Sequence, residues 1–479
     1  MQALGTAPRP SSSQALLPAA LLIALLGACV AVGMTAIGPA ALLPIFGLLV
    51  FVLVASFPEY GIALFLSTFL IAYPKGLQGS GAVTINNVLG ALFLVLLTFK
   101  MYKDPDWWFL RCRELQLLAF ICLVFYLADR FNGPDRRLVS LVGVLAARAE
   151  SARTFITRSV FTVFFVNFIR KPPHVVMIYV LAIALMTISA VSGVRTVLHG
   201  GGLHGYRAAA GGIILSAANP NRLAMFSIIP IAGLWYYARS SRSRTVMALV
   251  VPGIAVLALT VFMTGSRSGL LGLGVCAAAI IVKERVMLTQ LLGMALISVL
   301  VLVLVLQLVP QKTFTRITNL PFTQAGETGE GSGSLGRRAY GWKVAFQMFQ
   351  QHPFIGVGNG NWELTRYLTD PQRTTAAPHS SYLLALVEGG ALSLMAFLLL
   401  LWRTWRNLRS VEAYLRDRNS PLAQLNWVVH SAEVNLLVLV FFSLFADLWQ
   451  LVVLFWLIGL SVVVCRMVEH AAFEEVAVY

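Results

Sequence analysis

Charged residues are scarce in this chain. Only 12% of its 479 residues are charged, whereas 58% are hydrophobic, and the mean hydropathy is +0.79. Soluble domains carry about 25% charged residues. This scarcity of charge excludes an ordinary soluble protein and favours a chain that lies largely in a lipid bilayer.

Cysteines and acidic residues are also few. The five cysteines lie mostly in apolar runs without metal-ligand spacing, so neither a disulfide framework nor structural zinc is expected. The formal net charge of +16 is scattered over membrane-flanking loops, and no nucleic-acid-binding signature accompanies it. We therefore expect the charge to meet anionic lipid headgroups of the membrane or a phosphorylated lipid substrate, and no nucleic acid.

Apolar runs long enough to cross a bilayer recur along the chain. Backbone groups in lipid must be paired within their own segment, so each run is expected to be a helix. The sequence thus predicts an all-α polytopic membrane protein, with an interfacial stretch at 138–147. The candidate spans, several of them short, are residues 16–36, 38–57, 59–73, 84–102, 114–128, 155–170, 174–193, 220–238, 244–264, 268–283, 287–309, 380–402, 428–446 and 448–467.

Short basic connectors indicate the orientation of the spans. With an even number of spans they fall on one side together with both termini, and that side is expected to be the cytoplasm. The long polar segment from Pro310 to Pro378 then faces the other side. We find no internal repeat of the kind that transporters show. The basic connectors are residues 100–103, 170–171, 239–244, 283–285 and 403–409.

The long polar segment is predicted to contain a helix. Apolar residues at three- and four-residue spacing mark its buried face: Trp342, Ala345, Phe346 and Phe349. Arg338 lies four residues before Trp342, in line with that face. A charge there is costly unless it is paired, and a substrate anion or a distant carboxylate are the two alternatives.

Two arginines occur at predicted helix starts on the same outer face. Asn219 is a plausible N-cap, followed by Pro220 at the first helical position, Asn221 and Arg222. Free backbone N–H groups beside Arg222 would form an anion-binding corner, unless the side chain only reaches lipid headgroups. Arg267 lies in a tight connection of glycines and serines. This connection is equally consistent with a phosphate-binding site and with an ordinary turn.

His379 follows Pro378 and precedes a long apolar helix. A helix N-terminus disfavours imidazolium, which keeps a neutral general base available, although a lone histidine is more often structural. Tyr382, one turn further on, is placed to orient His379 or a sugar. Carboxylates near this outer mouth are sparse, so no metal site is predicted. Glu388 lies inside an apolar run and marks either function or close helix packing.

These residues together resemble the O-antigen ligase and polymerase superfamily. The order and spacing agree over about residues 209–400, whereas Ser380 stands where many members have asparagine. The matching motifs are Asn219-Pro220-Asn221-Arg222, Ser266-Arg267-Ser268-Gly269, the segments from Ser334 to Trp342 and from His352 to Gly360, Pro378-His379-Ser380-Ser381-Tyr382-Leu383 and Glu388-Gly389-Gly390.

The resemblance implies a GT-C-like membrane fold with about 12 (12–14) transmembrane helices, so some of the short spans are not true spans. The implied organisation has N-terminal transmembrane helices over 1–310, a periplasmic loop over 311–379 and C-terminal transmembrane helices over 380–479. It places the protein in a bacterial inner membrane with its active site facing the periplasm.

The activity implied by the resemblance is inverting glycosyl transfer without a metal or other cofactor. The donor is a polysaccharide on undecaprenyl diphosphate, and the acceptor of a ligase is lipid A–core oligosaccharide. His379 would take the acceptor proton, and Arg222, Arg267 and Arg338 would hold the diphosphate. The alternatives are an O-antigen polymerase, a pilin O-oligosaccharyltransferase and, outside this class, a flippase or transporter of lipid-linked sugar.

Overall fold

The computed structural model describes residues 50–71, 85–133, 146–199, 208, 219–241, 243–284, 299, 301, 303–313, 334–362, 365–366, 378–416, 420–449 and 451–477. The predicted span 16–36, most of 38–57 and 287–309, and most of the interfacial stretch 138–147 lie outside these residues. The chain divides into two compact units, Met1–Gly61 and Ile62–Tyr479. In the first unit, residues 50–56 are helical and α3 (Pro58–Leu70) begins.

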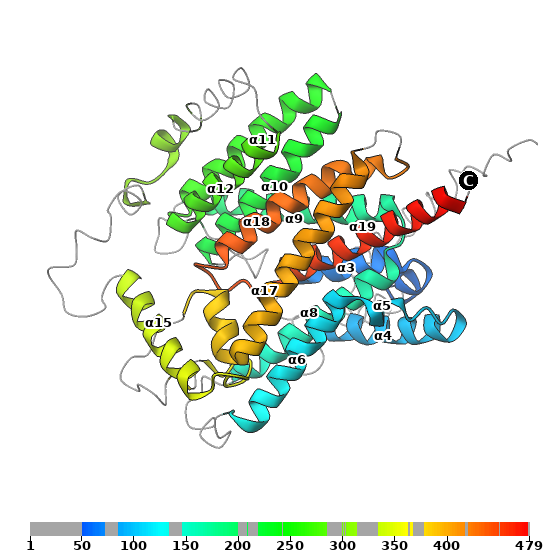
Figure 1. Cartoon of the computed structure of the whole chain (residues 1–479). Helices are drawn as coiled ribbons and strands as arrows, with labels where there is room; N and C mark the ends of the chain where they lie inside the picture. The colour runs from blue at the N-terminus through cyan, green and yellow to red at the C-terminus, as the bar shows by residue number, and fades with distance from the viewer. Residues whose placement is uncertain are drawn as a thin grey trace, which may run out of the picture. The chain divides into compact units, whose positions relative to one another are not determined.

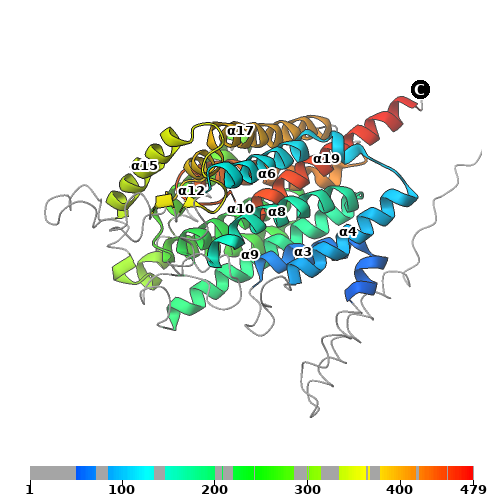
Figure 2. The same ribbon diagram turned by 90° about the horizontal axis from the view of Figure 1, so that it is seen from below.

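Every regular element of the described residues is a helix, and the helices that carry the predicted site residues all belong to the second unit (Figure 1). After α3, the described helices of this unit are α4 (Ile85–Lys103), α5 (Trp108–Arg111), α6 (Arg113–Phe131), α8 (Ala146–Phe168), α9 (Pro172–Leu198), α10 (Pro220–Ser241), α11 (Arg244–Met263), α12 (Arg267–Glu284), α15 (Ser334–Gln351), α17 (Ser381–Leu415), η5 (Ala423–Leu425), α18 (Asn426–Phe442) and α19 (Val452–Ala477) (Figure 1 and Figure 2). The predicted site residues lie on or next to α10, α12, α15 and α17.

Six of the described helical segments are long and apolar enough to cross a membrane: α4, α9, α11, α17, α19 and the continuous segment Ala423–Phe442. Large apolar side chains also remain exposed on these helices, as on α9, where Val180, Ile188 and Val191 are about half exposed. Such faces suit contact with lipid tails. The described residues therefore agree with the predicted polytopic membrane protein.

Helix α10 packs against four helices, α9, α11, α12 and α18. Small residues permit this close packing. A β-carbon added to Gly269 would lie 2.7 Å from Cβ of Ala224, and one added to Gly193 would lie 2.5 Å from the Leu223 side chain. Gly269 and Ala224 are each in the first turns of their helices. Their contact therefore holds the N-termini of α12 and α10 side by side.

The long helix α17 is broken at Gly390, which has φ 65°. A loop inserts at the break: the N–H of Ala391 donates to Pro353 O (2.8 Å), and the N–H of Gly358 donates to Glu388 O (2.9 Å). The Glu388 carboxylate accepts from Asn359 Nδ2 and from the N–H of Gly360, both at 2.9 Å. Of the two interpretations of Glu388, packing is the one that these contacts support.

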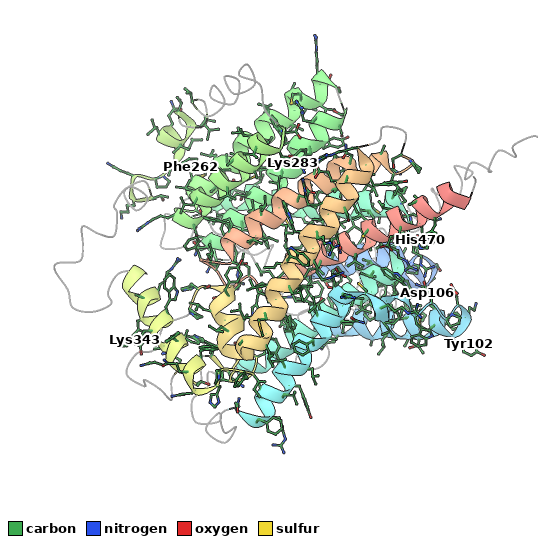
Figure 3. All side chains as sticks on the ribbon, in the orientation of Figure 1. Tyr102, Asp106, Phe262, Lys283, Lys343 and His470 are labelled. Carbon is green, nitrogen blue, oxygen red and sulfur yellow. The ribbon has the colours of Figure 1, made fainter. Side chains whose placement is uncertain are left out.

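Charged residues join the other ends of the same helices. Lys283, in the last turn of α12, bridges the carboxylates of Glu412 on α17 and Glu433 on α18. Arg239 at the end of α10 pairs with Glu284 at 2.9 Å. Helices α10 and α12 therefore end in the predicted basic connectors, whereas residues 403–409 are helical and lie inside α17, which continues to Leu415. Figure 3 shows Lys343 of α15 well apart from Asp106 and His470.

Candidate active site

The N-terminus of α10 forms as the sequence predicted. Asn219 Oδ1 accepts the backbone N–H of Asn221 at 2.9 Å, and Asn219 O accepts the N–H of Leu223. The N-cap and the proline at the first helical position are thus confirmed. Arg222 follows in the first turn, and its side chain is partly buried.

The N-terminus of α12 is capped in the same manner. Ser266 Oγ accepts the N–H of Gly269 at 3.0 Å and exchanges a hydrogen bond with Ser268 at 3.1 Å, so both hydroxyls are engaged within the turn. The serines thus shape the connection rather than standing free for phosphate. Arg267 is the first residue of the helix and is partly buried.

Helix α15 packs against α17 (Figure 1), but its buried face differs from the predicted one. Trp342 and Phe346 are 46% and 56% exposed, whereas the buried positions include Ala345 and Met348. Our assignment of Trp342 and Phe346 to the buried face was therefore wrong, because smaller or slimmer side chains make the close contact. Arg338 remains in line with Ala345 and is itself partly buried.

Trp342 is exposed, but its indole N–H makes a hydrogen bond to the segment before His379. Its indole N–H donates to the carbonyl of Pro378 at 3.0 Å, directly before His379. One turn of helix separates Trp342 from Arg338. The hydrogen bond therefore holds the Arg338 turn next to the segment that carries His379.

His379 has a strained backbone, with φ 46°. Left-handed conformations are uncommon outside glycine and asparagine, and surrounding contacts must maintain them. Those contacts come from the loop between α18 and α19: the N–H of Ser381 donates to Ser443 O, and Ser381 Oγ donates to Ala446 O, both at 2.8 Å. Ser380 caps α17, accepting from the N–H of Leu383. These contacts fix the backbone at His379 and thereby limit the directions that its imidazole can take.

Asp447 lies in the same loop and faces the imidazole. His379 Nδ1 and Asp447 Oδ2 are 3.8 Å apart, an ion-pair distance that is too long for a hydrogen bond. Burial raises the pKa of Asp447, whereas the positive charges of His379, Arg222 and Arg338 and the N–H of Ser380 lower it. Sequence reasoning missed Asp447. The signal was present, because the residue separates the last two predicted spans and so falls on the His379 side.

Arg158 on α8 is a second residue that sequence reasoning missed. It lies inside the predicted span 155–170, so we assigned it to an apolar run and gave it no role. In the structure its charge interacts with that of Arg222, and its guanidinium carbon lies 6.0 Å from the ring centre of Phe69. Its Nε is buried without a hydrogen-bond partner among the described residues.

The interactions between these charges join the predicted residues into one set. Arg222 and Arg338 both interact with Asp447, Arg267 interacts with Arg338, and Arg158 interacts with Arg222. Burial lowers the pKa of Arg338, the charge of Asp447 opposes this change, and the charge of Arg267 adds to it. The N-termini of α10, α12 and α17 thus meet with α8, α15 and the 443–451 loop.

The four guanidinium groups of this set outnumber the carboxylate that faces them among the described residues. In the part of the chain that the structure describes, neither Arg158, Arg222, Arg267 nor Arg338 makes an ion pair or a side-chain hydrogen bond. Asp447 is the carboxylate with which the set interacts, and its Oδ1 is buried without a hydrogen-bond partner there. Partly buried cations that outnumber their carboxylate favour a bound anion.

Tyr382 lies beside His379 but its hydroxyl is already engaged. It donates to Val440 O at 2.9 Å and so ties α17 to α18. Asn219 uses its side-chain oxygen for the helix cap. Tyr382 therefore links α17 to α18, and Asn219 caps α10. Direct contact of either residue with a substrate stays a prediction.

Carboxylates that could hold a metal lie elsewhere. Glu412, His430 and Glu433 bring ligand atoms within 4.8 Å of one another, but the Lys283 ammonium already bridges the two glutamates. An Asp-x-Asp sequence, Asp104 to Asp106, likewise lies outside the arginine set, because Asp106 pairs with Arg466 in the second half of α19. Neither group faces the arginine set.

A comparison with protein families finds one match. Residues 252–398 match the family described as O-antigen ligase. The matched segment includes Arg267, Arg338 and His379, whereas Arg158, Arg222 and Asp447 lie on either side of it. None of the curated proteins compared with the chain matches it.

Proposed function

The match supports membership of the O-antigen ligase superfamily, whose members are glycosyltransferase-like enzymes; on that premise we propose that this protein is an O-antigen ligase. The reaction transfers a polysaccharide from undecaprenyl diphosphate to a sugar hydroxyl of lipid A–core oligosaccharide. Transfer takes place on the periplasmic face of the bacterial inner membrane. The observation that carries the proposal is the set of four partly buried arginines around His379 and Asp447, none of which makes an ion pair within the described residues.

The arginines suit a diphosphate leaving group. A diphosphate carries several negatively charged oxygens, and guanidinium groups bind such oxygens in pairs. As the bond between the anomeric carbon and the diphosphate oxygen breaks, negative charge develops on that oxygen. Prearranged cations stabilise this charge in the transition state, a task that other transferases assign to a metal ion. Arg222, Arg267 and Arg338 take this role, and Arg158 extends the positive field.

His379 suits general base catalysis. Its Nδ1 faces Asp447, so Nε2 is the nitrogen that takes the acceptor proton. The acceptor oxygen forms its bond to the anomeric carbon on the face opposite to the departing diphosphate, which inverts the configuration. The Asp447 carboxylate stabilises the imidazolium that results, and the strained backbone at His379 fixes its direction.

A deletion strain tests the assignment. Loss of all long-chain lipopolysaccharide with accumulation of intact lipid-linked polysaccharide is expected for a ligase. Lipopolysaccharide capped by a single repeat unit would instead indicate the polymerase. Donor trapped on the cytoplasmic side would indicate transport. Either of the latter results would overturn the proposal, and complementation by the wild-type gene is the control.

A further inference from the structure

A cavity of about 260 Å³ is lined in part by Arg403 and Asn407, which lie in the part of α17 after the break at Gly390. The break folds the first turns of α17 back along this later part, because the ring centroids of Tyr382 and Phe397 are 5.8 Å apart. The lining of the cavity includes neither His379 nor any of the four arginines around it. Helices α5, α6, α17 and α19 supply the wall residues Trp108, Arg111, Cys112, Arg113, Glu114, Arg403, Asn407, Val462, Cys465, Arg466 and Glu469.

Two of the four arginines in this wall are fixed by neighbouring groups. Arg403 Nε donates to Glu114 Oε1 at 2.8 Å, and Asn407 Nδ2 donates to the same oxygen at 3.0 Å. Arg466 pairs with Asp106 at 2.6 Å and stacks over the Trp108 ring at 4.3 Å. These contacts hold both guanidinium planes in place at the cavity and satisfy the buried Glu114 carboxylate.

The other two arginines have no such partners. Arg111 and Arg113 are exposed, and among the described residues neither makes an ion pair. Glu469 is the remaining carboxylate of the wall and is exposed, with Cys465 Sγ 3.8 Å from its Oε1. The wall therefore carries an excess of positive charge with exposed donors at its rim.

The surroundings place this cavity at a membrane surface. Trp107 and Leu110 on one side and Trp402 on the other are 53%, 54% and 52% exposed. Exposed tryptophans at the ends of apolar helices are typical of the headgroup level of a bilayer. Leu398 and Leu399, one turn before Trp402, are also about half exposed and continue toward the lipid tails.

We propose that this cavity binds the phosphate group of an anionic phospholipid. Arg111 and Arg113 contact the phosphate oxygens, and Arg403 and Arg466 contribute their fixed charges. The exposed apolar side chains next to the opening accommodate the acyl chains, which a free phosphate ion lacks. The proposal is independent of the glycosyl transfer reaction, because it uses none of the residues around His379.

Native mass spectrometry of the full-length protein in detergent tests this site. The protein is incubated with equal amounts of phosphatidylglycerol and the zwitterionic phosphatidylcholine. Wild type is expected to retain phosphatidylglycerol preferentially. In R111Q/R113Q, retention should fall about fivefold or more, because each basic residue near an anionic lipid contributes about a fivefold factor. The control R244Q removes an exposed arginine of another basic connector and should leave retention unchanged.

Two results would overturn the proposal. Equal phosphatidylglycerol retention by wild type and R111Q/R113Q would show that the cavity is not the site. Displacement of the lipid by inorganic phosphate at millimolar concentration would show that the site recognises a free anion. If the double variant does not elute as a folded species, R111Q and R113Q are measured singly, and each is expected to lose part of the retention.

Discussion

Replacing Asp447 by asparagine should lower transfer activity without weakening the fold. Asparagine retains the shape and an oxygen that accepts the Ser380 N–H, so only the negative charge is lost. At the 3.8 Å between His379 and Asp447, two unit charges interact by about 4 kcal/mol at an effective dielectric constant of ~20 and about 1 kcal/mol in bulk water.

Exposure decides where in this range the effect falls. The His379 side chain is 43% exposed and that of Asp447 is 28% exposed, so water screens the pair considerably. We therefore expect the imidazolium to lose about 1–2 kcal/mol of stabilisation, which corresponds to a rate about 5- to 30-fold lower. The assay is transfer by purified protein with defined donor and acceptor, with the unfolding midpoint measured on the same sample.

The expected effect on stability has the opposite sign. Because burial raises the pKa of Asp447 in the folded protein, its ionised form disfavours folding at neutral pH. This cost is full above the folded-state pKa and is lost as the pH falls below 3.8, the unfolded value. The unfolding midpoint of D447N at pH 7 should therefore equal or exceed that of wild type. A lower midpoint together with lost activity would refute the reasoning and make Asp447 a structural residue.

Three further predictions concern the same region. H379A should lower transfer by about 10²–10⁴-fold while the protein remains folded, and near-normal long-chain lipopolysaccharide in a complemented strain would remove His379 from the base role. R222K, R267K and R338K should each lose most activity, because an ammonium keeps the charge but not the planar fork; full activity would reduce these arginines to headgroup anchors. G390A should fail to accumulate as a folded protein, since φ is 65° and a β-carbon would lie 2.2 Å from the Phe354 carbonyl; normal expression would contradict the insertion of the loop at the break in α17.

Local sequence rules predicted the parts of the site that depend on local structure. The cap at Asn219 and the proline after it follow from neighbouring residues alone. The predicted topology placed Arg222, Arg267, Arg338 and His379 on one face, and in the structure each of them interacts electrostatically with Asp447 or with another member of the set.

Features that depend on tertiary packing were not predictable in this way. In the sequence, Arg158 is a single charge in an apolar run. Its place in the arginine set becomes visible only in the structure, where its charge interacts with that of Arg222. The buried face of α15 was misassigned, because periodicity ranks Trp342 as core although its indole reaches the Pro378 carbonyl from an exposed position. Glu388 looked like an isolated charge, because its partners come from an inserted loop.

Transfer measured on purified protein in excess EDTA tests the central claim most directly. Wild type and H379A are compared with undecaprenyl-diphosphate-linked donor and lipid A–core acceptor, and donor binding is recorded on the same preparations. The arginine site predicts that wild type transfers at an undiminished rate in EDTA, with inverted configuration at the new linkage, and that H379A binds donor but does not transfer it. Loss of wild-type transfer in EDTA, with recovery on addition of Mg²⁺ or Mn²⁺, would contradict it.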